Sequence, residues 1–181
     1  IDIDDEDSQK LIRFFNEPIG REYLIKECGV APEFVQLLDY FGISGIANML
    51  CAIKMAKYYE LTEHDVIATV MTDSAVMYGS RIKELQEEDG AYTSAMAAVD
   101  YAKHIASIKT DNMEELTYTA RKRVHNLKYY TWVEQQGKSV EELNALWYDE
   151  ANTWGAVRNE AGAIDNLINE FNERTGLLKN L

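Results

Sequence analysis

The chain has 181 residues, of which 46% are hydrophobic and 27% charged, a composition typical of a soluble globular protein with its own core. Its formal net charge of −13 disfavours binding to nucleic acid and to anionic membranes, because both are negatively charged. No apolar run approaches the roughly 20 residues that a membrane-spanning helix needs. We therefore expect neither nucleic acid nor membrane among its partners.

The two cysteines, Cys28 and Cys51, lie in apolar surroundings without Cys-x-x-Cys spacing, which predicts a reduced, cytoplasmic protein. The first seven residues are acidic and lack the basic and apolar regions of a signal peptide. There is no initiator methionine, and the chain opens on what looks like a strand end or loop before a helix. This predicts a fragment, although a processed or engineered terminus would look the same.

The first 60 residues predict helices. A cluster of apolar residues between 5 and 16 follows an acidic first turn, which suits the helix dipole. Shorter helical pieces are expected at 20–27 and 32–40, and apolar residues recur with helical spacing from 44 to 59. Both prolines, Pro18 and Pro32, lie in this region, so later helices can run long.

Residues 65–72 predict a strand. They are short, β-branched and nearly continuously apolar, the pattern of a strand buried on both faces of a parallel sheet. A helix is expected to follow, so that 44–86 forms a helix–strand–helix unit. A lone parallel strand cannot pair with itself. We therefore expect the rest of its sheet to come from residues outside this chain or from another chain.

The remaining residues predict helices, so the chain is expected to be mostly α with one or few parallel strands. Asp111 with Glu114, and Ser139 with Glu142, match the capping-box pattern of a helix start. A final helix with heptad-like apolar spacing is expected to end at Gly176.

Metal and nucleophile chemistry are not expected. The histidines His64, His104 and His125 are scattered, and none has a second ligand at metal-binding spacing. There is no Gly-x-Ser-x-Gly motif. The basic run 121–123 is interpreted as a solvated helix face with aromatic residues packed behind it, with an anion or subunit contact as the smaller alternative.

Two segments are candidates for a binding site. Gly42–Asn48 opens a long helix, whose free N–H groups suit an anion or a flat cofactor, although Ser44 could equally be an ordinary N-cap. Thr72, Asp73 and Ser74 follow the predicted strand, at the end where ligands bind in open α/β sheets. Alternation along a strand places Thr72 and Ser74 on one side and Asp73 on the other. A simple cap of the next helix is an equal alternative.

Together these segments resemble the end of the large domain in the cysteine synthase and cystathionine β-synthase family of fold-type II pyridoxal-phosphate enzymes. The family pattern Gly-Ile-Ser-Ser-Gly-Ala-x is matched at Gly42, Ile43, Ser44 and Ala47. The pattern Pro-Asp-Ser-Gly-x-x-Tyr is matched at Asp73, Ser74 and Tyr78. The chain departs from these patterns where Gly45-Ile46 replaces Ser-Gly and where Ala75 replaces glycine.

Beyond about residue 90 the chain departs from ordinary cysteine synthases. Residues 129–137 and 171–178 look like the helical extension of a longer bacterial subgroup. The resemblance implies two domains. Residues 1–90 would be the C-terminal part of the large cofactor-binding domain, in a three-layer α/β fold of the tryptophan synthase β-like class, and residues 91–181 would be the helical C-terminal extension. It also implies a homodimer.

The resemblance implies specific chemistry for the full-length protein. The serine matched by Ser74 hydrogen-bonds the pyridine nitrogen of the cofactor, and Gly42 would lie close to the ring. A hydroxyl partner makes the ring a weaker electron sink, which suits β-elimination or β-replacement on a small amino acid such as O-acetylserine or serine. Asp73 facing the ring instead would reverse this electronic argument.

The family's Schiff-base lysine and phosphate loop lie in its amino-terminal half, so no catalytic residue is expected in this chain. Lys54, Lys57 and Lys83 are interpreted as exposed helix residues. Two alternatives remain open. One is an acidic helical module that binds a protein partner, and the other is a non-catalytic subunit that has lost the cofactor.

Overall fold

The structure is a computed structural model that describes residues 1–180. They form two compact units, Ile1–Glu114 (unit 1) and a second that begins at Glu115 (unit 2). Within the described residues every regular element is helical, which confirms the mostly α prediction. None of the described helices is both long enough and apolar enough to cross a membrane.

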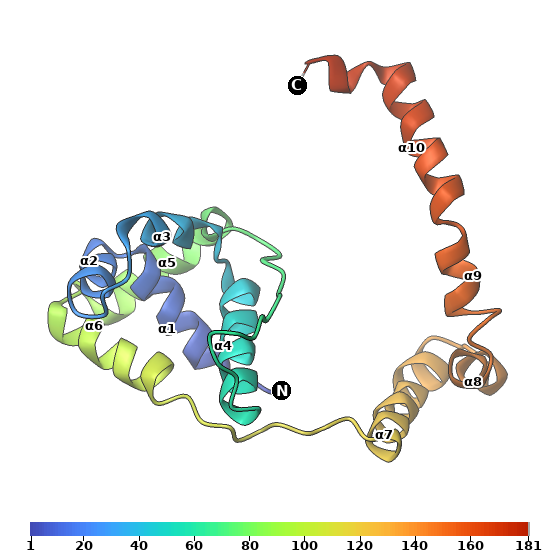
Figure 1. The fold of residues 1–181 in the computed structure, drawn as a ribbon, viewed down its shortest axis with the longest axis horizontal. Helices are drawn as coiled ribbons and strands as arrows, with labels where there is room; N and C mark the ends of the chain where they lie inside the picture. The colour runs from blue at the N-terminus through green and yellow to red at the C-terminus, as the bar shows by residue number, and fades with distance from the viewer. Residues whose placement is uncertain (181) are drawn as a thin grey trace. The chain divides into compact units, whose positions relative to one another are not determined.

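Unit 1 is built from short and medium helices (Figure 1). Its α-helices are α1 (Asp5–Asn16), α2 (Pro18–Lys26), α3 (Pro32–Gln36), α4 (Ile43–Tyr58), α5 (Gly79–Asp89) and α6 (Ser94–Tyr101). Two 3₁₀ turns, η1 (Leu37–Tyr40) and η2 (Ala75–Tyr78), and a π-helical turn, η3 (Ala102–Ala106), connect them or extend them. The helices predicted at 5–16, 20–27, 32–40 and 44–59 are therefore present with shifts of a few residues at their ends.

Helix α1 is the centre of unit 1. Asp4 caps it by accepting a 2.9 Å hydrogen bond from the Glu6 N–H, and the acidic first turn complements the helix dipole. Its apolar residues Leu11, Ile12 and Phe14 are completely buried. Figure 1 shows α4 on one side of α1 and α2 with α6 on the other, and all three contact it. The core of unit 1 therefore forms around one amphipathic helix.

A buried arginine ties α1 to the end of α5. The side chain of Arg13 is only 1% exposed, and its guanidinium donates a 2.9 Å hydrogen bond to the Leu85 carbonyl and another to the Gly90 carbonyl. Glu17 accepts a further bond at 3.2 Å, and the Tyr92 ring lies 5.0 Å from the guanidinium carbon. Such a charge is tolerated inside a protein because it is paired and hydrogen-bonded.

The expectation that Lys54 is exposed is wrong. Lys54 is 6% exposed, and its ammonium donates to the Asp2 carbonyl at 3.1 Å, the Asp111 carbonyl at 2.8 Å and the Asp111 carboxylate at 3.2 Å. These oxygens come from chain segments remote in sequence, so the helical spacing of α4 gave no sign of them. Lys57 and Lys83 are exposed, as expected.

The strand predicted at 65–72 does not form. These residues have no regular secondary structure and make a long connection between α4 and η2, with Val66 91% and Val70 67% exposed (Figure 1). A strand requires neighbouring backbone to satisfy its N–H and C=O groups. The described part of the chain supplies no such neighbour, so a β-branched run remains an exposed loop. The predicted helix–strand–helix unit is therefore a helix–loop–helix here.

Unit 2 is a series of helices with little burial. It contains α7 (Tyr118–Lys128), a π-helical segment η4 (Tyr129–Gln135), α8 (Val140–Tyr148), α9 (Trp154–Asn159), α10 (Ala161–Thr175) and a 3₁₀ turn η5 (Leu177–Asn180). Its few buried residues, such as His125 and Leu143, lie between α7 and α8. The predicted final helix is therefore two helices that meet at Glu160.

Two of the predicted helix ends are confirmed. Ser139 and Glu142 form a complete capping box at the start of α8, with hydrogen bonds of 3.0 and 2.8 Å. Gly176 ends α10 in the left-handed conformation, with φ of 64°, where glycine carries no steric penalty.

The capping box predicted at Asp111 and Glu114 is wrong. The next helix, α7, begins at Tyr118, and its cap is Thr117, which accepts from the Ala120 N–H at 3.3 Å. The Asp111 side chain and carbonyl bind Lys54 instead, so a contact with unit 1's own helix α4 outweighs the local capping pattern.

The boundary between the two units falls after Glu114. The predicted boundary at residue 90 lies inside unit 1, where α6 packs against α1 and α2. Whether residues 1–90 belong to a larger cofactor-binding domain, and 91–181 to its extension, stays a prediction.

Candidate functional site

The two segments singled out in the sequence meet in space. The Gly42 N–H donates a 3.0 Å hydrogen bond to the Asp73 carbonyl, and the Asn48 side chain donates a 2.9 Å bond to the Val70 carbonyl. These two bonds hold residues 70–74 against the N-terminal half of α4. We call Gly42, Thr72, Asp73 and Ser74 the Gly42–Ser74 corner.

Gly42 is buried at the start of α4, and a side chain there would be blocked. An added Cβ would overlap the Asp73 carboxylate, whose Cγ would lie 2.6 Å away. The backbone of Gly42 is extended, with φ of −76°, so conformational freedom is not the reason for a glycine. The close approach of Asp73 is what requires the missing side chain.

The Asp73 carboxylate occupies the helix start that could have received a ligand anion. Gly42 is the N-cap residue of α4 and has no side chain with which to cap it. The Asp73 carboxylate next to the first turn interacts favourably with the helix dipole. Asp73 also accepts hydrogen bonds from the Tyr78 hydroxyl and, at 3.2 Å, from the Thr72 hydroxyl. The hydrogen bond to this carboxylate raises the pKa of Tyr78.

Ser74 is half-buried, and both functions of its hydroxyl are in use. It donates a 3.0 Å hydrogen bond to the Asp39 carbonyl in η1 and accepts a 3.2 Å bond from the Val76 N–H. The second bond makes it the N-cap of η2. The capping alternative for this segment therefore describes what Ser74 does here, and Thr72 is exposed beside it.

An apolar cavity lies on the other side of η1. It measures about 430 Å³ and is lined by side chains from α1, α2, α3, η1, α4, α6 and η3. Two polar groups line it, the Cys28 thiol and the Tyr101 hydroxyl, and their hydrogen bond raises the pKa of Tyr101. Sequence reasoning missed this cavity because its walls come from helices far apart in the chain. The cavity shares η1 with the corner: Leu37 and Leu38 line it, while Asp39 holds Ser74.

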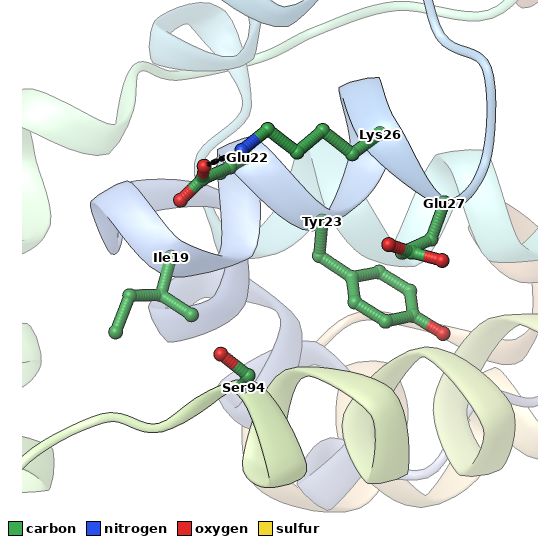
Figure 2. Close-up of a pocket in the computed structure, with 6 residues that line it drawn as sticks. All are labelled: Ile19, Glu22, Tyr23, Lys26, Glu27 and Ser94. Carbon is green, nitrogen blue, oxygen red and sulfur yellow. Dashed lines mark hydrogen bonds and ion pairs between the residues drawn. The ribbon is translucent and has the colours of Figure 1, made fainter.

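A second hollow, about 210 Å³, lies between α2 and the start of α6 (Figure 2). Two of its three charged residues pair with each other: the Lys26 ammonium pairs with Glu22, which raises the pKa of Lys26, and Glu27 leaves the hollow with one net negative charge. Both paired side chains are more than half exposed, at 65% and 55%. Exposed paired charges of this kind do not define a ligand site.

Among the described residues, no group of three histidine, cysteine or acidic side chains is placed to hold a metal ion. His104 is buried against Asp7 at 2.5 Å in unit 1, and His125 is buried in unit 2. The basic run 121–123 is mostly exposed, with Lys122 lying 4.7 Å from the centre of the Trp147 ring. The prediction of a solvated helix face is confirmed, but the aromatic residues that follow the run, Tyr129, Tyr130 and Trp132, are themselves 39%, 59% and 37% exposed and are not packed behind it.

The comparisons with known proteins found no match for the chain. No protein-family model matches it, and no curated protein and no solved structure matches it either. The similarity to fold-type II enzymes thus remains a hypothesis that depends on the residues of the Gly42–Ser74 corner.

Proposed function

We propose that this chain is part of a pyridoxal-phosphate enzyme resembling cysteine synthases, and that the Gly42–Ser74 corner lies along the edge of the cofactor ring. The enzyme would catalyse β-elimination or β-replacement on a small amino acid. The observation that carries the proposal is the bond between the Gly42 N–H and the Asp73 carbonyl. It brings together two motifs that match the family and lie far apart in sequence.

The residues of the corner fit a flat ring, provided that the Asp73 carboxylate leaves the space beside Gly42 and the Ser74 hydroxyl exchanges its acceptor. Gly42 presents no side chain, and Ser74 has a hydroxyl that rotates freely about its C–O bond. That hydroxyl now donates to the Asp39 carbonyl at 3.0 Å, and turning it toward a ring nitrogen costs one exposed hydrogen bond. Asp73 is already engaged by Thr72 and Tyr78, so Ser74 is the proposed ring partner.

A hydroxyl partner has an electronic consequence. The bound cofactor supplies an electron sink for chemistry at the substrate's α- and β-carbons. Ser74 can donate to an unprotonated ring nitrogen but cannot hold a proton there as a carboxylate would. This favours departure of a β-substituent over chemistry that needs a long-lived carbanion. The side chain of Ser74 would therefore orient the ring and keep it a weaker electron sink than a protonated ring would be.

The exposed loop at 65–72 supports the proposal that the chain belongs to a larger domain with a β-sheet. Its apolar β-branched side chains are exposed, with Val66 at 91%, which is costly in water. Neighbouring strands from residues outside this chain would bury them and pair the backbone, as in a three-layer α/β fold. The lysine that binds the cofactor would come from the same residues, because the Lys54 ammonium is enclosed by three oxygen atoms.

A second candidate is a helical interaction module or a subunit without cofactor. It is favoured by the closed core that unit 1 builds around α1, with Leu11, Ile12 and Phe14 fully buried without any strand. A fragment of a domain built on a β-sheet would bury its apolar residues against that sheet and would not need a closed core of its own. In either case we propose a cytoplasmic protein, in line with the free thiols of Cys28 and Cys51.

The test uses the complete polypeptide that contains residues 1–181. We expect it to bind pyridoxal phosphate, seen as a visible absorption band, and to release a β-substituent from O-acetylserine or serine. The change Ser74→Asp should shift that band and lower the elimination rate by at least about tenfold, because a nearby carboxylate would stabilise the protonated form of the ring nitrogen.

The matched control is Ser80→Asp, which adds the same charge at an exposed position of α5. It should leave the band and the rate unchanged. A complete polypeptide that takes up no cofactor would support the interaction module instead. A Ser74→Asp variant with an unchanged band and rate would show that Ser74 does not contact the ring.

A further inference from the structure

Helix α10 has an apolar face that nothing in its own unit covers. All of α10 lies in the described part of the chain, and none of its residues is buried. Ile164, Ile168 and Phe171 are 46%, 50% and 58% exposed. The helix contacts chiefly its sequence neighbours α9 and η5 (Figure 1). An isolated helix of 15 residues is marginal in water, so this face needs a partner.

The apolar residues follow the repeat of a coiled coil. Val157, Ala161, Ile164, Ile168 and Phe171 are separated by alternating steps of four and three residues, which places them at the a and d positions of successive heptads. Glu160 lies between α9 and α10 with right-handed helical backbone angles, φ of −75° and ψ of −14°, but its N–H bonds to the Val157 carbonyl only three residues back, so α9 and α10 are separate helices. The continuous part of the seam therefore lies within α10, from Ala161 to Thr175.

We propose that α10 pairs with α10 of a second copy of this chain in an antiparallel coiled coil. The first argument is the size of the seam residues. In the antiparallel register that sets Ile164 opposite Ile168 of the second copy, Ala161 lies opposite Phe171. The smallest and largest residues then fill one layer together. A parallel pair would set alanine against alanine and phenylalanine against phenylalanine, leaving a void in one layer and crowding another.

The second argument is charge. Glu160 and Arg174 occupy g positions beside the seam, and antiparallel pairing brings Glu160 of each copy next to Arg174 of the other. Arg174 is available, because its present ion pair with Glu170, at 3.4 Å, is exposed and weak. A parallel pair would instead set Glu160 beside Asp165, two like charges. Charge and size therefore select the same orientation.

One feature opposes the pairing. Asp165 occupies an e position, and in the antiparallel register it meets Asp165 of the second copy across the two-fold axis. This repulsion weakens the dimer at neutral pH. The change Asp165→Asn removes it and should tighten association by a few-fold, since exposed like-charge pairs of this kind have small effects.

The test is sedimentation equilibrium of the chain over a wide range of concentrations. The native chain should dimerise, and Ile168→Asp should weaken the dimer by at least about a hundredfold, because a carboxylate would be buried in the seam. The matched control, Asn166→Asp, places the same charge at an f position on the outer face and should leave association within about twofold. Far-ultraviolet circular dichroism checks that both variants keep their helices.

The orientation of the two helices is tested by reversing charges. Glu160 and Arg174 are both exposed, so reversing their charges should not prevent the monomer from folding. Glu160→Arg should weaken the dimer by roughly tenfold, because two attractive contacts become repulsive. Adding Arg174→Glu should restore it, and the control Glu173→Arg, at an outer f position, should do neither.

Three results would overturn the proposal. Glu160→Arg would tighten a parallel dimer, since the arginine would meet Asp165. A dimer that is indifferent to Ile168→Asp would use another surface. A concentration-independent monomer with α10 protected from hydrogen exchange would mean that the helix packs on its own chain.

Discussion

Unit 1 and unit 2 are both helical, but they differ in what their helices bury. In unit 1 four apolar residues of α1, Leu11, Ile12, Phe14 and Phe15, are at most 2% exposed. In unit 2 large apolar side chains such as Leu167 and Phe171 remain 64% and 58% exposed. Both sequences are amphipathic. An amphipathic helix therefore forms a core only where other helices pack against its apolar face, as α2, α4 and α6 pack against α1.

The largest expected effect tests whether the two units are independent. Phe14→Ala should destabilise unit 1 by about 3–5 kcal/mol, because Phe14 is completely buried and the cavity cannot collapse fully. All three tryptophans, Trp132, Trp147 and Trp154, lie in unit 2. Urea unfolding followed by circular dichroism should therefore shift to lower urea, while the tryptophan fluorescence transition stays where it was.

The control for this prediction is Phe34→Ala, at a phenylalanine that is 62% exposed, which should shift the same transition much less. If Phe14→Ala moves the circular dichroism and fluorescence transitions together, the two units unfold as one, and the contrast between them is wrong.

An intermediate effect is expected at Lys54. Lys54→Met keeps the apolar stem but removes the donor that joins Asp2 to Asp111, so it should cost about 1–3 kcal/mol. The Asp2 N–H, which donates to Asn112 at 2.9 Å, should then exchange with deuterium faster. The exposed Lys83→Met serves as the control. Equal exchange in both variants would show that Lys54 does not hold these segments.

The smallest expected effect is the response of unit 2 to acid. Burial lowers the pKa of His125, with added repulsion from Lys128 and Lys122, and the centre of its ring lies 5.1 Å from that of Trp147, with the two rings tilted by 48°. Its buried Nε2 atom has no hydrogen-bond partner among the described residues. The folded state thus favours neutral His125. Its contribution to stability is complete above the unfolded pKa of about 6.5 and is lost as pH falls below that value.

The measurement is urea unfolding of unit 2, followed by tryptophan fluorescence at pH 7.5 and at pH 5.5. The native chain should lose stability between these values, and His125→Phe should lose less, because it keeps the ring and removes the titrating group. An identical loss in the variant would assign the acid response to other groups.

The residues of the candidate site could be predicted from the sequence, but the structure around them could not. The family patterns identified Gly42, Asp73 and Ser74, the end of the predicted strand added Thr72, and these four residues do lie together. The predicted strand beneath them does not form. Strand propensity at 65–72 is local, but pairing requires a second backbone that lies elsewhere. The apolar cavity next to η1 carried no sequence signal, because no single helix pattern records what several helices enclose.

Helix starts and ends followed from the sequence where the signal was local. Ser139 and Glu142 cap α8 through neighbouring backbone, and Gly176 ends α10 through its own φ angle. Asp111 carried the same local signal, yet its oxygens went to Lys54, because a buried ammonium needs acceptors more than an exposed helix end needs a cap.

The sequence by itself determined the mostly helical class, the amphipathic face of α1 and the heptad seam of α10, because each depends on residue spacing along one helix. Only the tertiary structure decided that Lys54 and Arg13 are buried, that Asp73 occupies the start of α4, and that 65–72 lies exposed. Each of these depends on which distant backbone or side chain arrives to supply hydrogen bonds. The spacing of residues along one helix does not show which distant groups will lie next to it.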